Sequence, residues 1–243
     1  MADAIRVQKA VADAGLMSRR TAEDAIREGR VAIDGRPAVL GDRVDVSVQQ
    51  VTLDGIPIPV NPDLETYLLY TPPGVVSTAS DPEGRRTVVD LVAGAGRLFP
   101  VGRLDYDSEG LILLTNDGDL ANRVTHPRYG IVKKYLALVG GGPTRADVKR
   151  LVEGIDLEDG PARALSASIV GRQGGETMVE LTMGEGRNRE IRRMFEAMGF
   201  RVIRLVRTAI GPISDRSLKP GQSRRLSTSE IRDLLASGSP GDR

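Results

Sequence analysis

Apolar residues recur at two different spacings along this chain of 243 residues. Near the amino terminus the spacing is helical from Ile5 to Ala14, and Ser18 stands where an N-cap would begin a second helix over residues 19–28. The pair Asp34-Gly35 is typical of a hairpin turn, and valines at 44, 46 and 48 alternate as in a strand. These patterns predict a small unit of two helices and a few short strands.

The pattern after residue 65 predicts a larger unit of interleaved strands and helices. Short apolar runs indicate strands at residues 67–70, 111–114, 133–139, 166–170, 178–183 and 202–206. Helical spacing occurs at residues 119–125, 144–153 and 191–198, and residues 227–230 form a capping box for a last helix. Short strands mixed with a few helices predict the α+β class.

Punctuating residues divide the chain into parts. Prolines at 57, 59 and 62 together with Asn61 indicate a break after the small unit, and the end of the chain is rich in glycine, serine and proline. We therefore predict a first domain at residues 1–60, a linker at 61–65, a second domain at 66–236 and a disordered tail at 237–243.

Composition narrows the chemistry that this chain can use. Cysteine is absent, which excludes disulfides, thiolate nucleophiles and sulfur-ligated metals. The single histidine, His126, lies between a predicted helix and Pro127, which favours a structural cap over a general base. A formal charge of +1 requires that any affinity for polyanions come from local patches. No apolar run approaches the roughly 18 residues of a membrane helix, and a cytoplasmic protein without a membrane partner is expected.

The first candidate site is the segment of residues 102–118, GRLDYDSEGLILLTNDG. Arg103, Asp105, Asp107 and Glu109 alternate with other residues directly before the apolar run that predicts a buried strand. Loops held by a rigid scaffold often contain catalytic groups, whereas most charge runs are solvated surface turns. Spacing alone leaves both interpretations open.

The second candidate segment runs from Arg187 to Arg207 and contains seven arginines and two acidic residues. The apolar helical stripe at 191, 194, 195 and 198 does not allow Arg192 and Arg193 both to face solvent. One of them must border the core, where an arginine requires a partner. A carboxylate such as that of Asp105 would supply it.

Three segments resemble known sequences. Residues 102–118 resemble the catalytic motif of pseudouridine synthases of the RsuA/RluB family, GRLD-x-DS-x-GLLLLTNDG, with Ile112 as a conservative difference. Residues 185–199, EGRNREIRRMFEAMG, resemble its RluB branch, and residues 3–50, with AGLMSRRTAEDAIREGRVAIDG and LGDRV, resemble the S-four-type RNA-binding domain. The resemblance implies an S-four-type domain followed by a catalytic domain with a mixed, mainly antiparallel sheet flanked by helices.

The resemblance also implies residue roles. Asp105 would be the catalytic carboxylate, Arg192 would keep it charged and aimed, and Tyr135, from a K-x-Y segment, would enter the active site. Leu205 would pack beneath the target base. The side chains expected to bind RNA are Arg103, Leu205, Arg187 and Arg189 and, in the first domain, Lys9, Arg19, Arg20, Arg27 and Arg30. Isomerisation of uridine to pseudouridine requires no cofactor and no metal.

The expected substrate is ribosomal RNA or a ribosomal-subunit assembly intermediate, with 23S favoured over 16S RNA, and no obligate protein partner is indicated. The target nucleotide would be flipped into the pocket. Two alternatives from other classes stay open. One is a non-catalytic RNA-binding factor in ribosome assembly. The other is a nuclease or glycosidase that uses Asp105 with Asp107 or Glu109.

Overall fold

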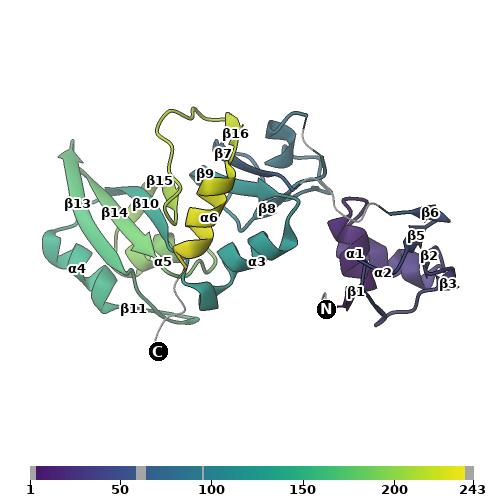
Figure 1. Ribbon diagram of the computed structural model, residues 1–243. Coiled ribbons are helices and arrows are strands. Elements are labelled where there is room, and N and C mark those ends of the chain that lie inside the picture. Colours follow the sequence, from purple (N-terminus) through teal and green to yellow (C-terminus); the bar gives the residue numbers. More distant parts are fainter. Residues whose placement is uncertain (1–3, 59–63, 95, 239–243) are drawn as a thin grey trace. The chain divides into compact units, whose positions relative to one another are not determined.

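The computed structural model describes residues 4–58, 64–94 and 96–238. These residues form two compact units, the first mainly of residues 4–58 and the second mainly of residues 66–238 (Figure 1). The predicted linker (61–65) and tail (237–243) lie largely outside the described residues. Both therefore stay predictions.

The first unit contains two helices and two small sheets. Its helices are α1 (Val7–Asp13) and α2 (Arg19–Arg27), and its strands are β1 (Ile5–Arg6), β2 (Val31–Ile33), β3 (Arg36–Pro37), β4 (Arg43–Val44), β5 (Val51–Leu53) and β6 (Ile56–Pro57). The Ser18 side chain accepts a hydrogen bond from the Thr21 amide at 3.1 Å, which confirms the predicted N-cap. One strand pair is β1 with β4, and the other sheet has the order β3-β2-β5-β6.

A predicted hairpin turn is confirmed in the four-stranded sheet, and one predicted strand is shorter than expected. Asp34 and Gly35 both have positive φ, 50° and 79°, as a type I′ turn requires, which confirms the predicted turn between β2 and β3. The valine alternation was misleading beyond Val44, because the Asp45 carboxylate accepts a hydrogen bond from the Ser47 amide at 3.0 Å and turns the chain. Val48 is consequently 80% exposed.

The second unit is built on one twisted sheet of eight strands, counted over the described residues, with the order β13-β14-β10-β15-β9-β7-β16 and with β8 beside β9. The strands are β7 (Thr66–Thr71), β8 (Phe99–Val101), β9 (Glu109–Thr115), β10 (Lys133–Gly140), β13 (Ser166–Gln173), β14 (Glu176–Met183), β15 (Arg201–Ile210) and β16 (Ser223–Arg225). A separate hairpin pairs β11 (Ile155–Leu157) with β12 (Gly160–Ala162).

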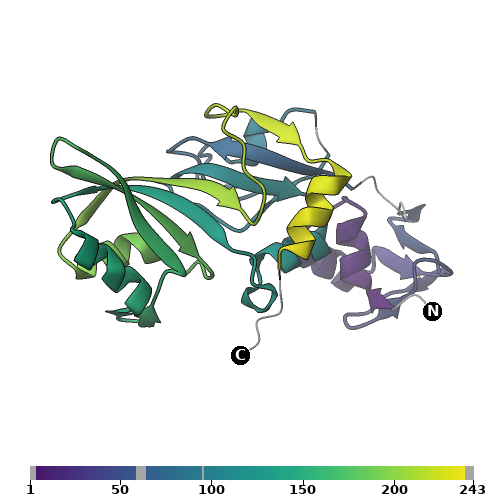
Figure 2. The same cartoon turned by 60° about the vertical axis from the view of Figure 1, so that its left-hand side comes forward.

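Helices of this unit pack against the sheet. The helices are η1 (Val89–Leu91), α3 (Gly118–Thr125), η2 (Pro127–Tyr129), α4 (Arg145–Glu153), α5 (Glu190–Ala197) and α6 (Thr228–Ala236). Along β14, buried residues alternate with more exposed ones, so the strand has one covered face, and Figure 2 shows α4 and α5 on the same side of the sheet. All strand pairs are antiparallel except β9 with β15, which confirms the expected mixed, mainly antiparallel sheet.

Strand β9 is the most buried strand of the sheet, since all seven of its residues are buried. It pairs with β7 along one edge and with β8 and then β15 along the other. The predicted buried strand is thus confirmed. The loop between β8 and β9 leads directly into this strand in the interior of the sheet.

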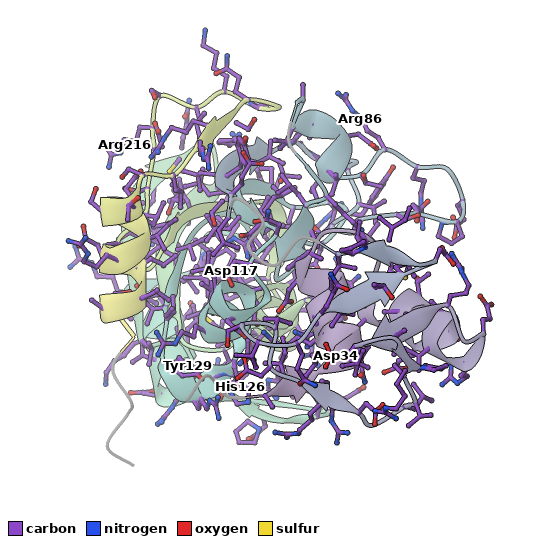
Figure 3. The ribbon with its side chains drawn as sticks, turned by 45° about the vertical axis from the view of Figure 1, so that its right-hand side comes forward. Asp34, Arg86, Asp117, His126, Tyr129 and Arg216 are labelled. Carbon is purple, nitrogen blue, oxygen red and sulfur yellow. The ribbon has the colours of Figure 1, made fainter. Side chains whose placement is uncertain are left out.

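Other local predictions are confirmed as well. His126 is the N-cap of η2, where its ring nitrogen Nδ1 accepts a hydrogen bond from the Arg128 amide, and Figure 3 shows it close to Tyr129. Ser227 and Glu230 form the predicted capping box at the start of α6. None of the helices in the described part of the chain is long and apolar enough to cross a membrane.

Candidate active site

A cavity of about 300 Å³ opens between the loop before β9, strands β10, β14 and β15, and the start of α5. Asp105 enters it from the loop between β8 and β9, Tyr135 from β10 and Leu205 from β15. Tyr135 and Leu205 are buried, and Asp105 is half-buried. The structure therefore brings together three of the residues predicted from sequence, although Asp105 and Leu205 are separated by 100 positions in the chain (205 minus 105).

The backbone of the loop that contains Asp105 is held at every carbonyl from residue 103 to residue 107. Each of these five oxygens accepts one hydrogen bond, and the donors come from several segments. The bonds are Arg207 Nη1 to Arg103 O (3.2 Å), Ser77 Oγ to Leu104 O (3.0 Å), Ser108 N to Asp105 O (2.9 Å), Gly74 N to Tyr106 O (2.8 Å) and Arg192 Nη2 to Asp107 O (2.9 Å). A loop without free carbonyls has few alternative conformations, so Asp105 is presented in a defined position.

A glycine allows β15 to approach the end of this loop. Gly110 lies opposite Arg207 in the parallel pairing of β9 with β15 and has φ of +108°. A Cβ atom at this position would lie 2.3 Å from the Arg207 carbonyl oxygen. Only glycine fits, and the guanidinium of Arg207 can then reach the carbonyls of Leu111 (2.6 Å) and Arg103.

Asp107 is the centre of the ion pairs beside the cavity. Its carboxylate receives two hydrogen bonds from Arg189, Nη1 to Oδ1 at 2.9 Å and Nη2 to Oδ2 at 3.1 Å. Arg192 Nε lies 3.4 Å from Asp107 Oδ2. These hydrogen bonds and charges lower the pKa of Asp107, and they raise the pKa of Arg189, to which the negative charge of Asp105 also contributes.

The expected ion pair between Arg192 and Asp105 is replaced by contacts with the neighbouring residues. The sequence correctly predicted that one of the adjacent arginines borders the core, since Arg192 is only 5% exposed. Its guanidinium, however, binds the backbone of Asp107, the carbonyl of Val202 (3.0 Å) and the hydroxyl of Ser108 (3.4 Å). Arg192 therefore holds the loop, and its ion pair is with Asp107.

Arg187, predicted to bind RNA, lines the cavity but has its guanidinium occupied by the protein. Its Nε donates to the buried Glu190 at 3.0 Å, and Nη2 donates to the carbonyl of Pro161 at 2.8 Å. Nη1 contacts Asp159, which also pairs with Arg193. Arg187 thus connects the start of α5 to the β11–β12 turn. Arg103 and Arg189 are exposed and also line the cavity, and the guanidinium of Arg189 is paired with Asp107.

The predicted RNA-binding side chains of the first unit fall into two groups. Lys9 pairs with Asp13, Arg27 with Asp24, and Arg30 makes two hydrogen bonds to Asp54. Arg19 and Arg20 begin α2 and are exposed.

The three carboxylates that a nuclease would need do not converge. Asp105 faces the cavity, Asp107 pairs with Arg189, and Glu109 is buried against Arg204 and the hydroxyl of Tyr70. Within residues 4–58, 64–94 and 96–238 there is no cluster of three or more His, Cys, Asp or Glu side chains suited to a metal ion.

Sequence reasoning did not identify two residues that shape the site. Ser77 bonds both the amide and the carbonyl of Leu104 at 3.0 Å, and nothing in its sequence context signals this contact. Arg207 is buried in β15 between the buried Leu205 and Ala209, whereas Arg201 and Arg204 of the same strand are exposed. A charged residue inside an apolar strand pattern is a signal that could have been used, because burial of a cation requires partners.

Comparison with known families agrees with this geometry. The model of the RNA pseudouridylate synthase family matches residues 65–197, and the S4 domain model matches residues 5–49. An uncharacterized RNA pseudouridine synthase of Mycobacterium leprae is 48% identical over 96% of this chain and 93% of its own length. Ribosomal large subunit pseudouridine synthase B of Bacillus subtilis is 42% identical over 95% of this chain and 96% of its own length.

A solved structure described as a crystal structure of pseudouridylate synthase has the same fold. It superposes with a TM-score of 0.67 at 30% sequence identity and covers 95% of this chain and 99% of its own. The family match spans more than half of the chain and includes the loop that contains Asp105. The chain belongs to the RNA pseudouridylate synthase family and is a pseudouridine synthase with an S4 domain at its amino terminus.

Proposed function

We propose that this enzyme converts a uridine of large-subunit (23S) ribosomal RNA to pseudouridine, with Asp105 as the catalytic residue. The main support is the position of Asp105, which is half-buried at a cavity beside Tyr135 and Leu205 on a fully hydrogen-bonded loop. Similarity to relatives named for the large ribosomal subunit favours 23S RNA, naked or in an assembling subunit.

The reaction breaks the C1′–N1 bond of uridine and forms a C1′–C5 bond, while a proton leaves C5 and N1 gains one. No atoms are added, so the enzyme must retain the detached base and turn it. Asp105 acts at the sugar, either as a nucleophile at C1′ or by stabilising positive charge there and moving a proton. Tyr135 and Leu205 are the cavity walls that we assign to the base.

We assign Arg192 a positioning role, because its contacts are with the loop and not with the cavity.

Arg103 and Arg189, at the mouth, are the candidates for holding the RNA strand beside the flipped nucleotide, and the S4 domain would bind more distant phosphates. This assignment leaves the reaction at the sugar to Asp105.

The first prediction concerns Asp105→Asn. Turnover should fall by about 10³-fold or more, since the amide can neither attack C1′ nor accept a proton. The measurement is pseudouridine formation in ribosomal RNA together with RNA affinity. The matched control, Asp156→Asn, changes an exposed carboxylate in β11 and should be fully active.

Retained turnover in Asp105→Asn would rule out the assigned chemistry. The RNA target is tested separately by mapping pseudouridines in both ribosomal RNAs from cells with and without the protein. A missing modification in 16S RNA alone would contradict the proposed substrate while leaving the chemistry intact.

A further inference from the structure

A second cavity, of about 270 Å³, adjoins the catalytic one. The two cavities share Arg103, Tyr135 and Glu185 in their walls. The second cavity also contains two cations that the proposed chemistry does not use, Lys133 and Arg207.

The strand register places these cations on one face. Lys133 and Tyr135 are two residues apart in β10, whose pairing with β14 is unbroken from Lys133 to Val139, so both side chains lie on the same side of the sheet. Arg207 of β15 lies directly opposite Tyr135. Lys134, between them in sequence, is exposed and faces the other side.

Arg207, in the wall of this cavity, has a hydrogen-bond donor without a partner among the described residues. The residue is 4% exposed, and its Nε and Nη1 donate to backbone carbonyls. Its Nη2 is buried and has no hydrogen-bond partner among the described residues. An unsatisfied buried donor on a cation is costly, and an anionic oxygen would satisfy it.

Lys133 is half-buried and has no acidic partner in the described part of the chain. Its Nζ has a long hydrogen bond to the carbonyl of Val124, at 3.4 Å. Burial and the nearby charge of Arg207 lower the pKa of Lys133 to about 8. Two repelling cations in one cavity would be stabilised by a shared anion, whereas the carboxylate in the wall, Glu185, is exposed.

We propose that Lys133 and Arg207 bind one phosphate group of the RNA backbone next to the nucleotide whose base enters the catalytic cavity. This subsite rests on the proposed function, because a base and its neighbouring phosphate are linked through one ribose and the two cavities share a wall. RNA has a negative charge at each nucleotide, so a strand that delivers a base also delivers a phosphate.

The test compares Lys133→Gln with Lys134→Gln, which removes the same charge from the opposite face of the same strand. Affinity for an RNA fragment that the enzyme modifies is measured over a range of salt concentrations. Lys133→Gln should reduce the slope of log K against log salt by about 0.7 and weaken binding several-fold, as expected for one lost phosphate contact. Lys134→Gln should not change the slope. Equal effects of the two substitutions would overturn the proposal.

A second arm identifies the phosphate. Neutral methylphosphonate linkages are placed singly on each side of the target uridine. One of them should lower kcat/KM for the unmodified enzyme and have a smaller effect on Lys133→Gln, because that variant has already lost the lysine contact and keeps only that of Arg207. Additive losses at both positions would overturn the proposal.

A third arm separates failure of the subsite from failure of the proposed function. Inorganic phosphate is titrated into the full chain while lysine Nζ resonances are followed by NMR, with Lys133→Gln providing the assignment. Phosphate should raise the pKa of Lys133, since an adjacent anion favours the ammonium form. An unchanged resonance overturns the subsite even if the enzyme modifies RNA. A response to phosphate without any RNA effect of Lys133→Gln shows a free-anion site only and also overturns the proposal.

Discussion

Asp107 lies two positions after the proposed catalytic residue in the sequence. Its ion pairs indicate a role in holding the loop and not in the reaction itself. Its carboxylate joins Arg189 at the mouth of the cavity to Arg192 in the interior, while its carbonyl accepts a second bond from Arg192. Removing the carboxylate would leave the partly buried charge of Arg192 without its ion pair, which weakens one support of the loop.

The second prediction is that Asp107→Asn lowers kcat by about 10- to 100-fold, because misplacement of a catalytic group by about an ångström is sufficient for such a loss. Tm should change little, because Arg192 keeps its hydrogen bonds to the carbonyls of residue 107 and Val202. Single-turnover kinetics and a melting curve provide the two readouts. Asp156→Asn again serves as the control. A kcat equal to that of the unmodified enzyme would show that the Asp107 ion pairs do not position Asp105.

At the scale of single residues, the sequence predicted whether a side chain is buried better than it predicted which residues that side chain contacts. The apolar stripe of α5 required that Arg192 or Arg193 be buried, and Arg192 is. The identity of its partner depends on a contact across 85 positions of sequence, which local spacing does not encode. Ser77 was missed for the same reason, because its two bonds to Leu104 cross 27 positions.

At the scale of elements, the parallel contact of β9 with β15 is the junction on which the site depends. The apolar runs predicted where strands occur, and most strands lie where they were expected. The order of the strands in the sheet could not be predicted from the sequence. A run of apolar residues indicates that a strand is buried, but it does not indicate which strands lie beside it. At Val46 and Val48, by contrast, alternation predicted a strand that does not form, because hydrogen bonds from Ser47 to the Asp45 carboxylate turn the chain.

The third prediction tests this junction with Gly110→Ala. The added Cβ would lie 2.3 Å from the Arg207 carbonyl and would sit at positive φ, so the free energy of unfolding should decrease by about 3 kcal/mol or more. Gly171→Ala in β13 is the matched control, because its Cβ would be 3.7 Å from Met178 and no backbone strain is involved. Chemical denaturation of both variants measures the difference, and equal stabilities would contradict the close approach.

The fourth prediction concerns Arg224, which joins β16, α6 and the loop before β16. Its guanidinium binds Asp215 at 2.6 Å and Glu230 at 2.8 Å. Hydrogen bonds from Arg224 and the Ser227 amide lower the pKa of Glu230 to about 2, and bonds from Ser217 and Arg224 lower that of Asp215 to about 2. Both shifts favour the folded protein only while the carboxylates are ionised.

Arg224→Met should therefore lower Tm by about 2–4 °C at pH 7, as expected for a loss near 1 kcal/mol. The pKa values of both acids are lower in the folded than in the unfolded chain, so the contribution is fully present above about pH 5 and disappears as pH falls towards 2. The difference in Tm between the two proteins should shrink over that range. Arg216→Met, in the same loop and exposed (Figure 3), should show no such pH-dependent difference.

At the scale of the whole molecule, the chain contains two units that each have a hydrophobic core. The core of the first unit includes Val11, Ile26 and Val31, and a core of the second includes Leu113 and Leu234. The sequence predicted two domains from changes in pattern and from proline positions. The family matches identify them as an S4 domain followed by a pseudouridine synthase domain. The exact boundaries stay predictions.

The fifth prediction is that a fragment of residues 64–243 folds by itself. It should retain the melting transition of the second unit and convert a short RNA at a measurable rate, because every residue assigned to the site belongs to that unit. Affinity for long ribosomal RNA should fall by about tenfold or more, since the phosphate contacts of the S4 domain are lost. Full affinity in the fragment would show that the S4 domain does not contribute to binding.

The fully bonded loop also affects when the enzyme first becomes competent during its synthesis. Its carbonyls depend on Arg192 and Arg207, which are translated 85 and 104 positions after their acceptors. A nascent chain that has exposed Asp105 but not α5 and β15 lacks these donors, and domains generally fold as units once they have emerged. The growing polypeptide, although held at the ribosome, is thus expected to be inactive until α5 and β15 have been made.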